Sequence, residues 1–477
     1  MTLRAERQRA RFAAGLTTIA GEVPVPALSV TGAIPGWLDG TLLRNGPARF
    51  EGGHRAYRHW FDGLAMLHRF DIHEGQVSYA NRFLDTDAYR AVRDGGRIGF
   101  GEFATDPCTS LFGRFFTRFG RRPSPNASVN VLPVADGCVA LTETPLPVAF
   151  DVETLAATGV VGYDDDLAGS VTTAHPQRDH CTGDVVNYVV RFGRESDYAV
   201  YRQAHDGNRR ELVGRFPVSR PAYMHSFALT ARYAVLVEFP LLVNPLSFLL
   251  RGRPFIENYR WRPEEGTRFV VMDLSDGSVR GEYRTGAFFA FHHVNAYDDG
   301  DDIVVDLCRY DDAAVIGALY LDQLRANAGV PVAYPYRYRV DLSGGTVTTS
   351  RLADVTLELP TVADATRNRL YRYAYGVSQF GGHGDDFINQ LAKVDTAGGA
   401  PVVWHEDGCY PGEPVFVAAP GATAEDDGVV LSAVLDSAAG RSFLLVLDAA
   451  TFTETARAEV PHAMPFGFHG VFRRRRP

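Results

Sequence analysis

Four histidines of this sequence share a setting that suits metal binding. His175, His225, His292 and His469 each lie beside aromatic or small residues, in TTAHPQRD, PAYMHSFALT, FFAFHHVNAY and MPFGFHGVF. An ion held by imidazoles alone is typical of Fe, Zn, Cu or Ni. The four lie far apart in the chain, so only a fold that returns several times to one place would bring them together.

The run FFAFHHVNAY places His292 next to His293 in a strand-like segment. Successive side chains of a strand point to opposite faces, so one imidazole is expected to face inward and the other outward. Spacing alone leaves open which one faces inward. Most other histidines, among them His59 and His405, lie in polar surroundings and are expected to face solvent.

Three glutamates lie in unusually apolar surroundings. Glu143 is in CVALTETPLP, Glu358 in DVTLELPTV and Glu413 in CYPGEPVFV. A buried carboxylate without a partner is costly, and a histidine that binds a metal usually donates its other ring N–H to an acceptor. The three glutamates are therefore candidate acceptors for the imidazoles, although each alone would also fit an exposed strand end.

A repeated pattern predicts the elements that position these residues. Seven times an apolar strand is followed by an Asp-containing turn and another strand, near residues 71, 151, 206, 273, 341, 395 and 448. Asp and Gly favour hairpin turns, and such repeats are typical of a seven-bladed β-propeller. An irregular array of β-sandwiches is the alternative. In a propeller, residues of different blades meet only at the central axis.

We therefore expect an all-β fold, a seven-bladed β-propeller whose loops and short helices cap an axial metal site. It would form a single domain over 1–477, with 1–30 as an N-terminal extension. The net charge of −9 does not indicate a basic, nucleic-acid-binding surface. Five scattered cysteines without a CxxC pair indicate a reduced, cytoplasmic chain, and the weakly apolar N-terminus argues against a signal peptide.

Two segments, 106–123 and 239–261, interrupt the β pattern with apolar residues mixed with Arg and Pro. Both are too short and too interrupted to span a bilayer. Their composition suits contact with a lipid surface, and it equally suits a buried loop.

The motifs resemble those of the carotenoid cleavage oxygenases almost from end to end. They include GTLLRNGPARFEGG, HWFDGLAMLHRF, YMHSFALT, FHHVNAYDDGDDIVVDLCRYD and FGFHGVF. The resemblance implies a seven-bladed propeller with one axial Fe(II), and the first histidine of FHH as a ligand. The implied ligands are His175, His225, His292 and His469. The implied orienting acids are Glu143, Glu358 and Glu413, which would orient His225, His292 and His469.

The same resemblance implies a dioxygenase that cleaves a conjugated C=C bond of a carotenoid or apocarotenoid with O2, giving aldehyde or ketone products. Thr142 matches a threonine that crowds the open side of the iron, and Phe103, Tyr223 and Phe468 match positions that line the substrate tunnel. Segments 106–123 and 239–261 match the apolar entry patch. Peripheral attachment to the inner membrane is therefore expected.

Alternative functions remain open at this point. A stilbene-cleaving dioxygenase is expected to use a Tyr and a Lys, but the only lysine, Lys393, falls in a predicted hairpin turn far from the N-terminal half. A non-catalytic carotenoid-binding propeller would need no iron. A propeller hydrolase would use carboxylates with Ca2+ or Zn2+, and no acidic axial cluster is evident.

Overall fold

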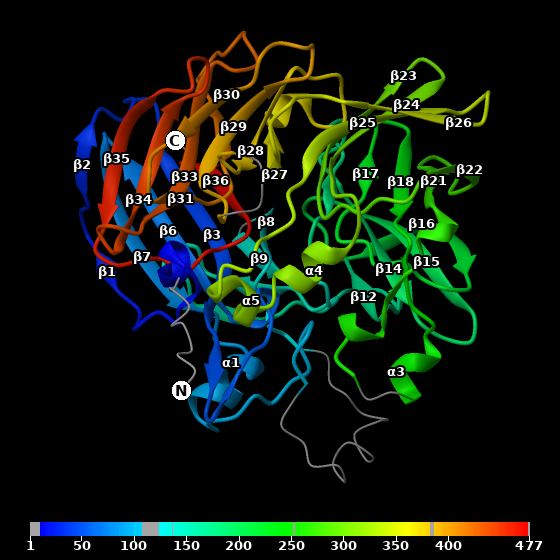
Figure 1. Ribbon diagram of the computed structural model, residues 1–477, viewed down its shortest axis with the longest axis horizontal. Coiled ribbons are helices and arrows are strands. Elements are labelled where there is room, and N and C mark those ends of the chain that lie inside the picture. Colours follow the sequence, from blue (N-terminus) through cyan, green and yellow to red (C-terminus); the bar gives the residue numbers. More distant parts are fainter. Residues whose placement is uncertain (1–9, 107–123, 136, 251–252, 382–385, 476–477) are drawn as a thin grey trace, which may run out of the picture.

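The computed structural model describes residues 10–106, 124–135, 137–250, 253–381 and 386–475. Within these residues the chain forms seven sheets of four to six strands and two short two-stranded sheets. Figure 1 shows the larger sheets arranged around a common centre. The predicted all-β, seven-bladed propeller is therefore confirmed.

The first four blades follow the chain order, with the first also receiving the last strand. Blade 1 contains β1 (Pro24–Val25), β3 (Gly40–Arg49), β6 (Leu64–His73), β7 (Gln76–Phe83) and β36 (Gly470–Arg474). Blade 2 contains β8 (Asn130–Val134), β9 (Gly137–Leu141), β10 (Val148–Phe150) and β11 (Ala157–Val160). Blade 3 contains β12 (Val171–Thr172), β13 (Gln177–Arg178), β14 (Val185–Arg191), β15 (Ser196–Gln203) and β16 (Arg210–Val218). Blade 4 contains β17 (Ala228–Leu229), β18 (Tyr233–Glu238), β21 (Thr267–Asp273) and β22 (Val279–Thr285).

The remaining three blades complete the ring. Blade 5 contains β23 (His293–Asp299), β24 (Asp302–Arg309), β25 (Tyr334–Asp341) and β26 (Thr346–Arg351). Blade 6 contains β27 (Glu358–Val362), β28 (Tyr373–Ser378), β29 (Gln390–Asp395) and β30 (Val402–His405). Blade 7 contains β2 (Ser29–Gly32), β31 (Cys409–Pro411), β32 (Val415–Ala418), β33 (Gly428–Asp436), β34 (Arg441–Asp448) and β35 (Glu454–Val460).

Short elements connect the blades. The two-stranded sheets pair β4 (Glu51–Gly52) with β5 (Arg55–Ala56) and β19 (Leu241–Leu242) with β20 (Arg260–Trp261). The α-helices are α1 (Asp87–Arg93), α3 (Leu246–Leu250), α4 (Ala314–Ala318) and α5 (Leu321–Arg325). The 3-10 helices are η1 (Arg11–Leu16), η2 (Trp60–Asp62), η4 (Ile256–Asn258), η5 (Pro263–Glu265) and η6 (Asp364–Thr366). None of the described helices has the length and apolar character needed to cross a membrane.

Each of the seven repeated units forms the outer hairpin of one blade. In the hairpin of β21 and β22, Asp273 Oδ1 accepts hydrogen bonds from the backbone N–H of Ser275 at 2.9 Å and from its hydroxyl at 2.6 Å. Gly277 in the same turn has a φ of 71°, a conformation that costs glycine little. In this hairpin, the Asp and Gly of the repeated pattern therefore stabilise the turn.

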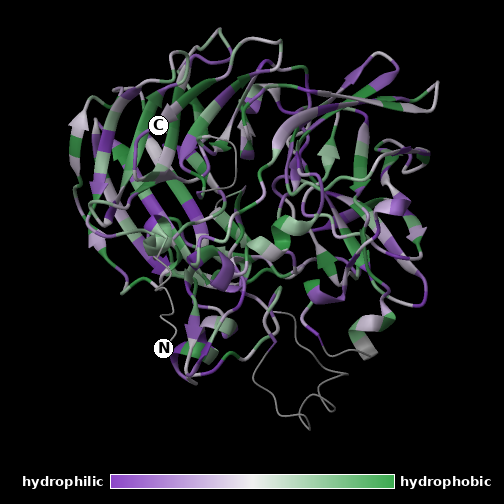
Figure 2. Ribbon diagram, in the orientation of Figure 1, coloured by the Kyte–Doolittle hydropathy of each residue, from purple (hydrophilic) through white to green (hydrophobic). Residues whose placement is uncertain are grey.

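The core lies between neighbouring blades. All six residues of the middle strand β18 are buried, whereas the outermost strand β26 has five exposed or partly exposed polar residues around one valine. Middle strands are covered on both faces by adjacent blades, which is why their residues are apolar without alternation. Between blades 1 and 7, for example, Leu42 and Phe70 belong to one cluster with Leu431 and Leu444. Figure 2 shows hydrophobic residues concentrated along the strands.

Strands from both ends of the chain close the ring. β36 pairs with β3 in blade 1, with Gly40 opposite Arg474, and β2 pairs with β35 in blade 7, with Ser29 opposite Glu459. Blade 1 thus contains a strand from the C-terminal end, and blade 7 contains one from the N-terminal end. The ring is held by backbone hydrogen bonds rather than by a disulfide, since the described cysteines Cys138, Cys181, Cys308 and Cys409 are all free.

The expected position of Lys393 is wrong. It lies inside β29 with 5% of its surface exposed, not in a turn. Its ammonium group contacts Asp426 Oδ2 at 2.6 Å and donates to the carbonyl oxygens of Ala449 and Ala450 at 2.8 and 3.0 Å. A carboxylate and two carbonyls from the adjacent blade make a buried lysine possible at a strand position.

Candidate metal centre

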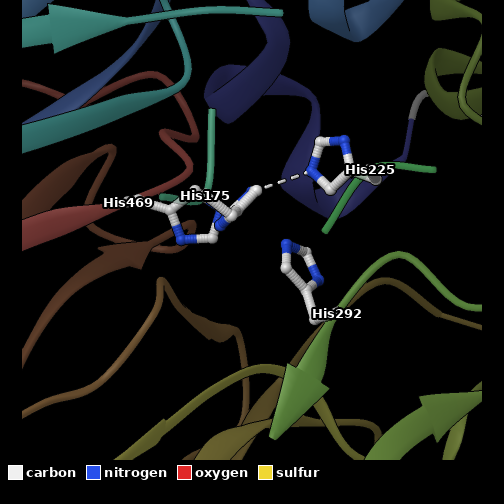
Figure 3. Close-up of side chains that lie close together, drawn as sticks. All are labelled: His175, His225, His292 and His469. Atoms are coloured by element: carbon white, nitrogen blue, oxygen red, sulfur yellow. Dashed lines mark hydrogen bonds between the residues drawn. The ribbon is translucent and has the colours of Figure 1, made fainter. Parts of the chain in front are cut away.

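Four of the seven blades each bring one predicted histidine to the axis. His469 directly precedes β36, His292 directly precedes β23, His175 lies between β12 and β13, and His225 lies three residues before β17. All four therefore lie at the starts of inner strands, where the blades converge. The structure brings the complete predicted set together (Figure 3).

The other three blades each bring one predicted glutamate. Glu143 follows β9 of blade 2, Glu358 begins β27 of blade 6, and Glu413 lies between β31 and β32 of blade 7. Every blade thus contributes one member of the seven-residue set. The axis is the one place in this fold that all seven sheets share.

The four imidazoles surround a small space. Their candidate ligand atoms all lie within 4.8 Å of one another. The Nε2 atoms of His175 and His225 are 3.0 Å apart, and the ring centroids of His175 and His469 are separated by 4.4 Å. Two cis nitrogen ligands that each lie ~2.05 Å from one ion would be ~2.9 Å apart. The spacing therefore fits ligands of a single ion.

Three of the imidazoles are oriented by carboxylates. The Nδ1 atoms of His225, His292 and His469 lie 2.7, 2.5 and 2.6 Å from oxygens of Glu143, Glu358 and Glu413, respectively. An ionised carboxylate can only accept, so each Nδ1 carries the proton and each Nε2 keeps its lone pair. Among the described contacts, His175 has no such carboxylate.

Burial and neighbouring groups shift the pKa values of several members of this set towards the protonation states that metal binding requires. Burial, reinforced by the neighbouring imidazoles, holds the pKa of His175 well below its usual value, and burial lowers the pKa of His469 to about 4. Burial alone would raise the pKa of Glu358 and Glu413, but His292 and His469 hold both below the usual range. Neutral imidazoles and ionised carboxylates are the forms that ligate and orient.

One buried atom tests whether an ion fits here. His292 Nε2 is buried and has no hydrogen-bond partner. The Nε2 atoms of His175 and His225 are also in close contact. The His225 Nε2 atom brings a lone pair to this contact. A cation between the rings would satisfy both features, so the residues present fit a bound metal ion.

An apolar cavity adjoins the cluster. Its empty space, open end included, is about 830 Å3, and His225, His292 and His469 form part of its wall. Rings and aliphatic side chains make up most of the rest, namely Trp60, Phe61, Phe291, Tyr310, Val315, Leu319, Phe387, Ile388 and Phe468. The lining could therefore place an apolar group of a bound molecule directly against the imidazoles.

The cap of the cavity depends on His59, whose expected exposure is wrong. His59 is fully buried, its Nε2 lies 3.0 Å from the carbonyl oxygen of Ile316, and its Nδ1 accepts the backbone N–H of Phe61 at 3.2 Å. Burial lowers its pKa to about 3, so it stays neutral. It ties η2, which carries Phe61, to α4.

The predicted substrate residues fall into two layers. Phe468 lines the cavity, whereas Phe103 and Tyr223 do not belong to its described wall and pack on each other with ring centroids 5.7 Å apart. The Tyr223 hydroxyl donates to Glu143 Oε1 at 2.8 Å. Thr142, directly before Glu143, is partly buried.

Sequence reasoning missed two residues close to the centre. Phe61 stacks with His225 at a centroid distance of 5.9 Å and packs edge-on against Phe468 at 5.2 Å. Arg44 contacts Glu413. Both lie in motifs quoted above, HWFDG and TLLRNG, but nothing in their spacing pointed to the axis.

A β-propeller with four imidazoles at its axis and an apolar cavity beside them is a scaffold that could hold a metal ion next to an apolar ligand. A family profile described as "Retinal pigment epithelial membrane protein" matches residues 16–474. The carotenoid-cleaving dioxygenase of Mustela putorius furo is 34% identical over 96% of this chain and 95% of its own length. The carotenoid isomerooxygenase of Galleria mellonella is 36% identical over 94% of this chain and 93% of its own.

Solved structures agree with this assignment. Cobalt-substituted apocarotenoid oxygenase from Synechocystis superimposes with a TM-score of 0.87 at 25% identity, covering 98% of this chain and all of that one. The chain therefore belongs to the carotenoid cleavage oxygenase family and is an oxidoreductase of the dioxygenase type.

Proposed function

We propose that this protein is an Fe(II) dioxygenase that cleaves a conjugated C=C bond of a carotenoid or apocarotenoid. The observation that carries the proposal is the cluster of His225, His292 and His469, which present unprotonated Nε2 atoms to one centre in the wall of an apolar, aromatic cavity. With His175, they would hold the ion. Fe(II) bound there would supply the activation of O2.

The reaction balances without a further reductant. Both atoms of O2 enter the broken double bond, and the two products each carry one carbonyl group. The protein residues bind and orient. Glu143, Glu358 and Glu413 fix the imidazole tautomers, Thr142 would crowd the open side of the ion, and aromatic side chains would hold the polyene with little loss of conformational freedom.

The aromatic lining supports a polyene substrate. Phe468 and Phe61 form a T-shaped pair inside the cavity, and we propose that Phe103 and Tyr223 shape the polyene's path from behind them. A phenolic stilbene is the second candidate substrate. The burial of Lys393 in blade 6, with its ammonium group held by Asp426, argues against a role for this lysine in binding such a substrate.

We also propose that the protein associates peripherally with a membrane through 106–123 and 239–261, where it could extract its substrate. Most of the first segment lies outside the described residues. In the second, Leu246 of α3 is 56% exposed, and an exposed leucine on a short helix suits contact with acyl chains. Sedimentation with liposomes, compared between wild type and Leu246→Ser, tests this part separately.

The enzymatic proposal is tested by anaerobic purification, metal analysis and exposure to O2 with β-carotene or an apocarotenal in detergent micelles. Iron at a stoichiometry of one per chain and aldehyde products identified by mass would support it, and the masses would name the bond. The surface variant His405→Ala serves as a control that should keep iron and activity. A chain that takes up no iron and cleaves neither polyene nor a stilbene would leave the binding propeller as the better account.

A further inference from the structure

Arg44 is a buried cation two hydrogen bonds away from one imidazole of the centre. It lies on β3, and 4% of its surface is exposed. Its Nη1 donates to Glu413 Oε2 at 2.6 Å and its Nη2 donates to the carbonyl oxygen of Phe468 at 2.9 Å. The other oxygen of Glu413 accepts the Nδ1–H of His469 at 2.6 Å.

The other two carboxylates of the centre have neutral partners. Glu143 accepts from the Tyr223 hydroxyl at 2.8 Å, and Glu358 accepts from the backbone N–H of Leu359 at 2.7 Å. Of the three, only Glu413 forms an ion pair with an arginine in the described structure. The three carboxylates that contact the imidazoles therefore differ in the charge of their own further partners: Glu413 has a cation, whereas Glu143 and Glu358 have neutral groups.

The charge balance of the centre depends on this arginine. Four neutral imidazoles and three carboxylates would carry three negative charges, which Arg44 reduces to two. A divalent ion then makes the buried assembly neutral. Without Arg44 it would keep one negative charge in an environment where charge is expensive to bury.

The local sequence also keeps space for this side chain. Gly470 faces Arg44 across the pair of β3 and β36, and a Cβ atom on Gly470 would lie 2.6 Å from Arg44 Cδ. The backbone N–H of Gly470 donates to Glu413 Oε2 at 2.9 Å. Backbone and guanidinium thus converge on the same carboxylate.

We propose that Arg44 is a positioning residue of the metal centre: it orients His469 through Glu413 and neutralises the assembly when a divalent ion binds. The inference rests on the proposed metal site. A buried ion pair is weak evidence for a purely stabilising role, because replacing such a pair by apolar groups is often neutral. Charge compensation predicts that Arg44 changes the stability of Fe(III) relative to Fe(II). A purely structural role of Arg44 would not produce this effect.

The experiment is a redox titration of the Fe(III)/Fe(II) couple after anaerobic loading of metal-free protein with Fe(II). Arg44→Met adds one uncompensated negative charge, so the potential should shift to more negative values. Arg44→Lys keeps the charge and should stay close to wild type. The matched control is Arg337→Met, which breaks a buried pair with Asp306 at 2.7 Å within blade 5 and should leave the potential unchanged.

A double variant distinguishes an effect of charge from an effect of misfolding. Arg44→Met combined with Glu413→Gln removes both charges and should return the potential toward the wild-type value. The inference is overturned if Arg44→Met has the wild-type potential, or if Arg44→Lys shifts it as far as Arg44→Met does. Wild-type protein that binds no iron would overturn the metal site itself, whereas normal iron loading with unmoved potentials would overturn only the role of Arg44.

Discussion

Glu358→Gln is the sharpest test of how the imidazoles are held. Glu358 Oε2 accepts both the Nδ1–H of His292 at 2.5 Å and the backbone N–H of Leu359 at 2.7 Å, and the Tyr310 hydroxyl also interacts with the Glu358 side chain. A glutamine can place its carbonyl oxygen at the Oε2 position and keep both bonds. The substitution therefore removes the charge and preserves the shape.

The expected loss follows from the bond that changes. A hydrogen bond to a charged group contributes ~1.5–3 kcal/mol, against ~0.5–1.5 kcal/mol for a neutral one. The difference of ~1–1.5 kcal/mol corresponds to roughly a tenfold weaker metal affinity, at the low end of the ~10–100-fold range for partners of ligating histidines. Glu358→Ala removes the acceptor altogether and should fall near the upper end of that range.

Competition with a chelator under anaerobic conditions measures these affinities, with Co2+ or Fe2+ as the probe ion. Glu282→Gln is the matched control, because Glu282 pairs with Arg268 at 2.8 Å on the outer strand β22 and its side chain is 47% exposed. It should bind metal like wild type. If Glu358→Gln also binds within twofold of wild type, the carboxylate charge does not support the ligand, and the reasoning fails.

Three further predictions, which use four substitutions, test the centre and its scaffold. His292→Ala should lose bound metal while His293→Ala keeps it, because the His293 Nδ1 atom lies 2.8 Å from the Ser226 hydroxyl, outside the cluster; metal analysis giving the reverse would exchange their roles. Lys393→Met breaks a buried pair and should lower the free energy of unfolding in urea by about 3–5 kcal/mol without changing metal content, and a loss of metal would contradict its purely structural role. Gly470→Ala places a Cβ 2.3 Å from a backbone carbonyl oxygen of β3 and should cost about 1–3 kcal/mol and weaken metal binding; wild-type affinity would show that the Arg44 side chain adapts freely.

The blade number and the histidine set could be predicted because both leave regular or distinctive local signals. Every blade has an outer hairpin. In five of them an Asp side chain accepts from a backbone N–H of the turn, namely Asp151, Asp273, Asp341, Asp395 and Asp448. A histidine between aromatic residues, such as His292 or His469, is distinctive because an apolar setting gives an imidazole no other partner. The axis of a closed ring then explains why distant positions meet.

The local sequence alone does not predict which glutamate meets which histidine across the ring, and those pairings came only from the family resemblance. Glu143 of blade 2 contacts His225 of blade 4 rather than a residue of the adjacent blade 3. This pairing depends on the tilt of the blades and on the length of the side chains. His59 and Lys393 were misplaced for a related reason: their local sequence is polar, but tertiary partners satisfy each of them in a buried position. The sequence shows which residues are adjacent in the chain. It does not show which hydrogen-bond acceptors the folded structure places next to a buried polar side chain.

The way the ring closes gives the centre a built-in order of assembly during synthesis. His469 and β36 come last, and β36 must pair with β3, which emerged from the ribosome more than four hundred residues earlier. A nascent chain that stops before this point has three of the four imidazoles, and only the pairing of β2 with β35, among the described strands, joins its two ends. Such non-local pairing is slow to form, so retention of the proposed ion would require that β36 has already paired with β3. Retention of the proposed ion would thus report this pairing in truncated or circularly permuted forms of the propeller.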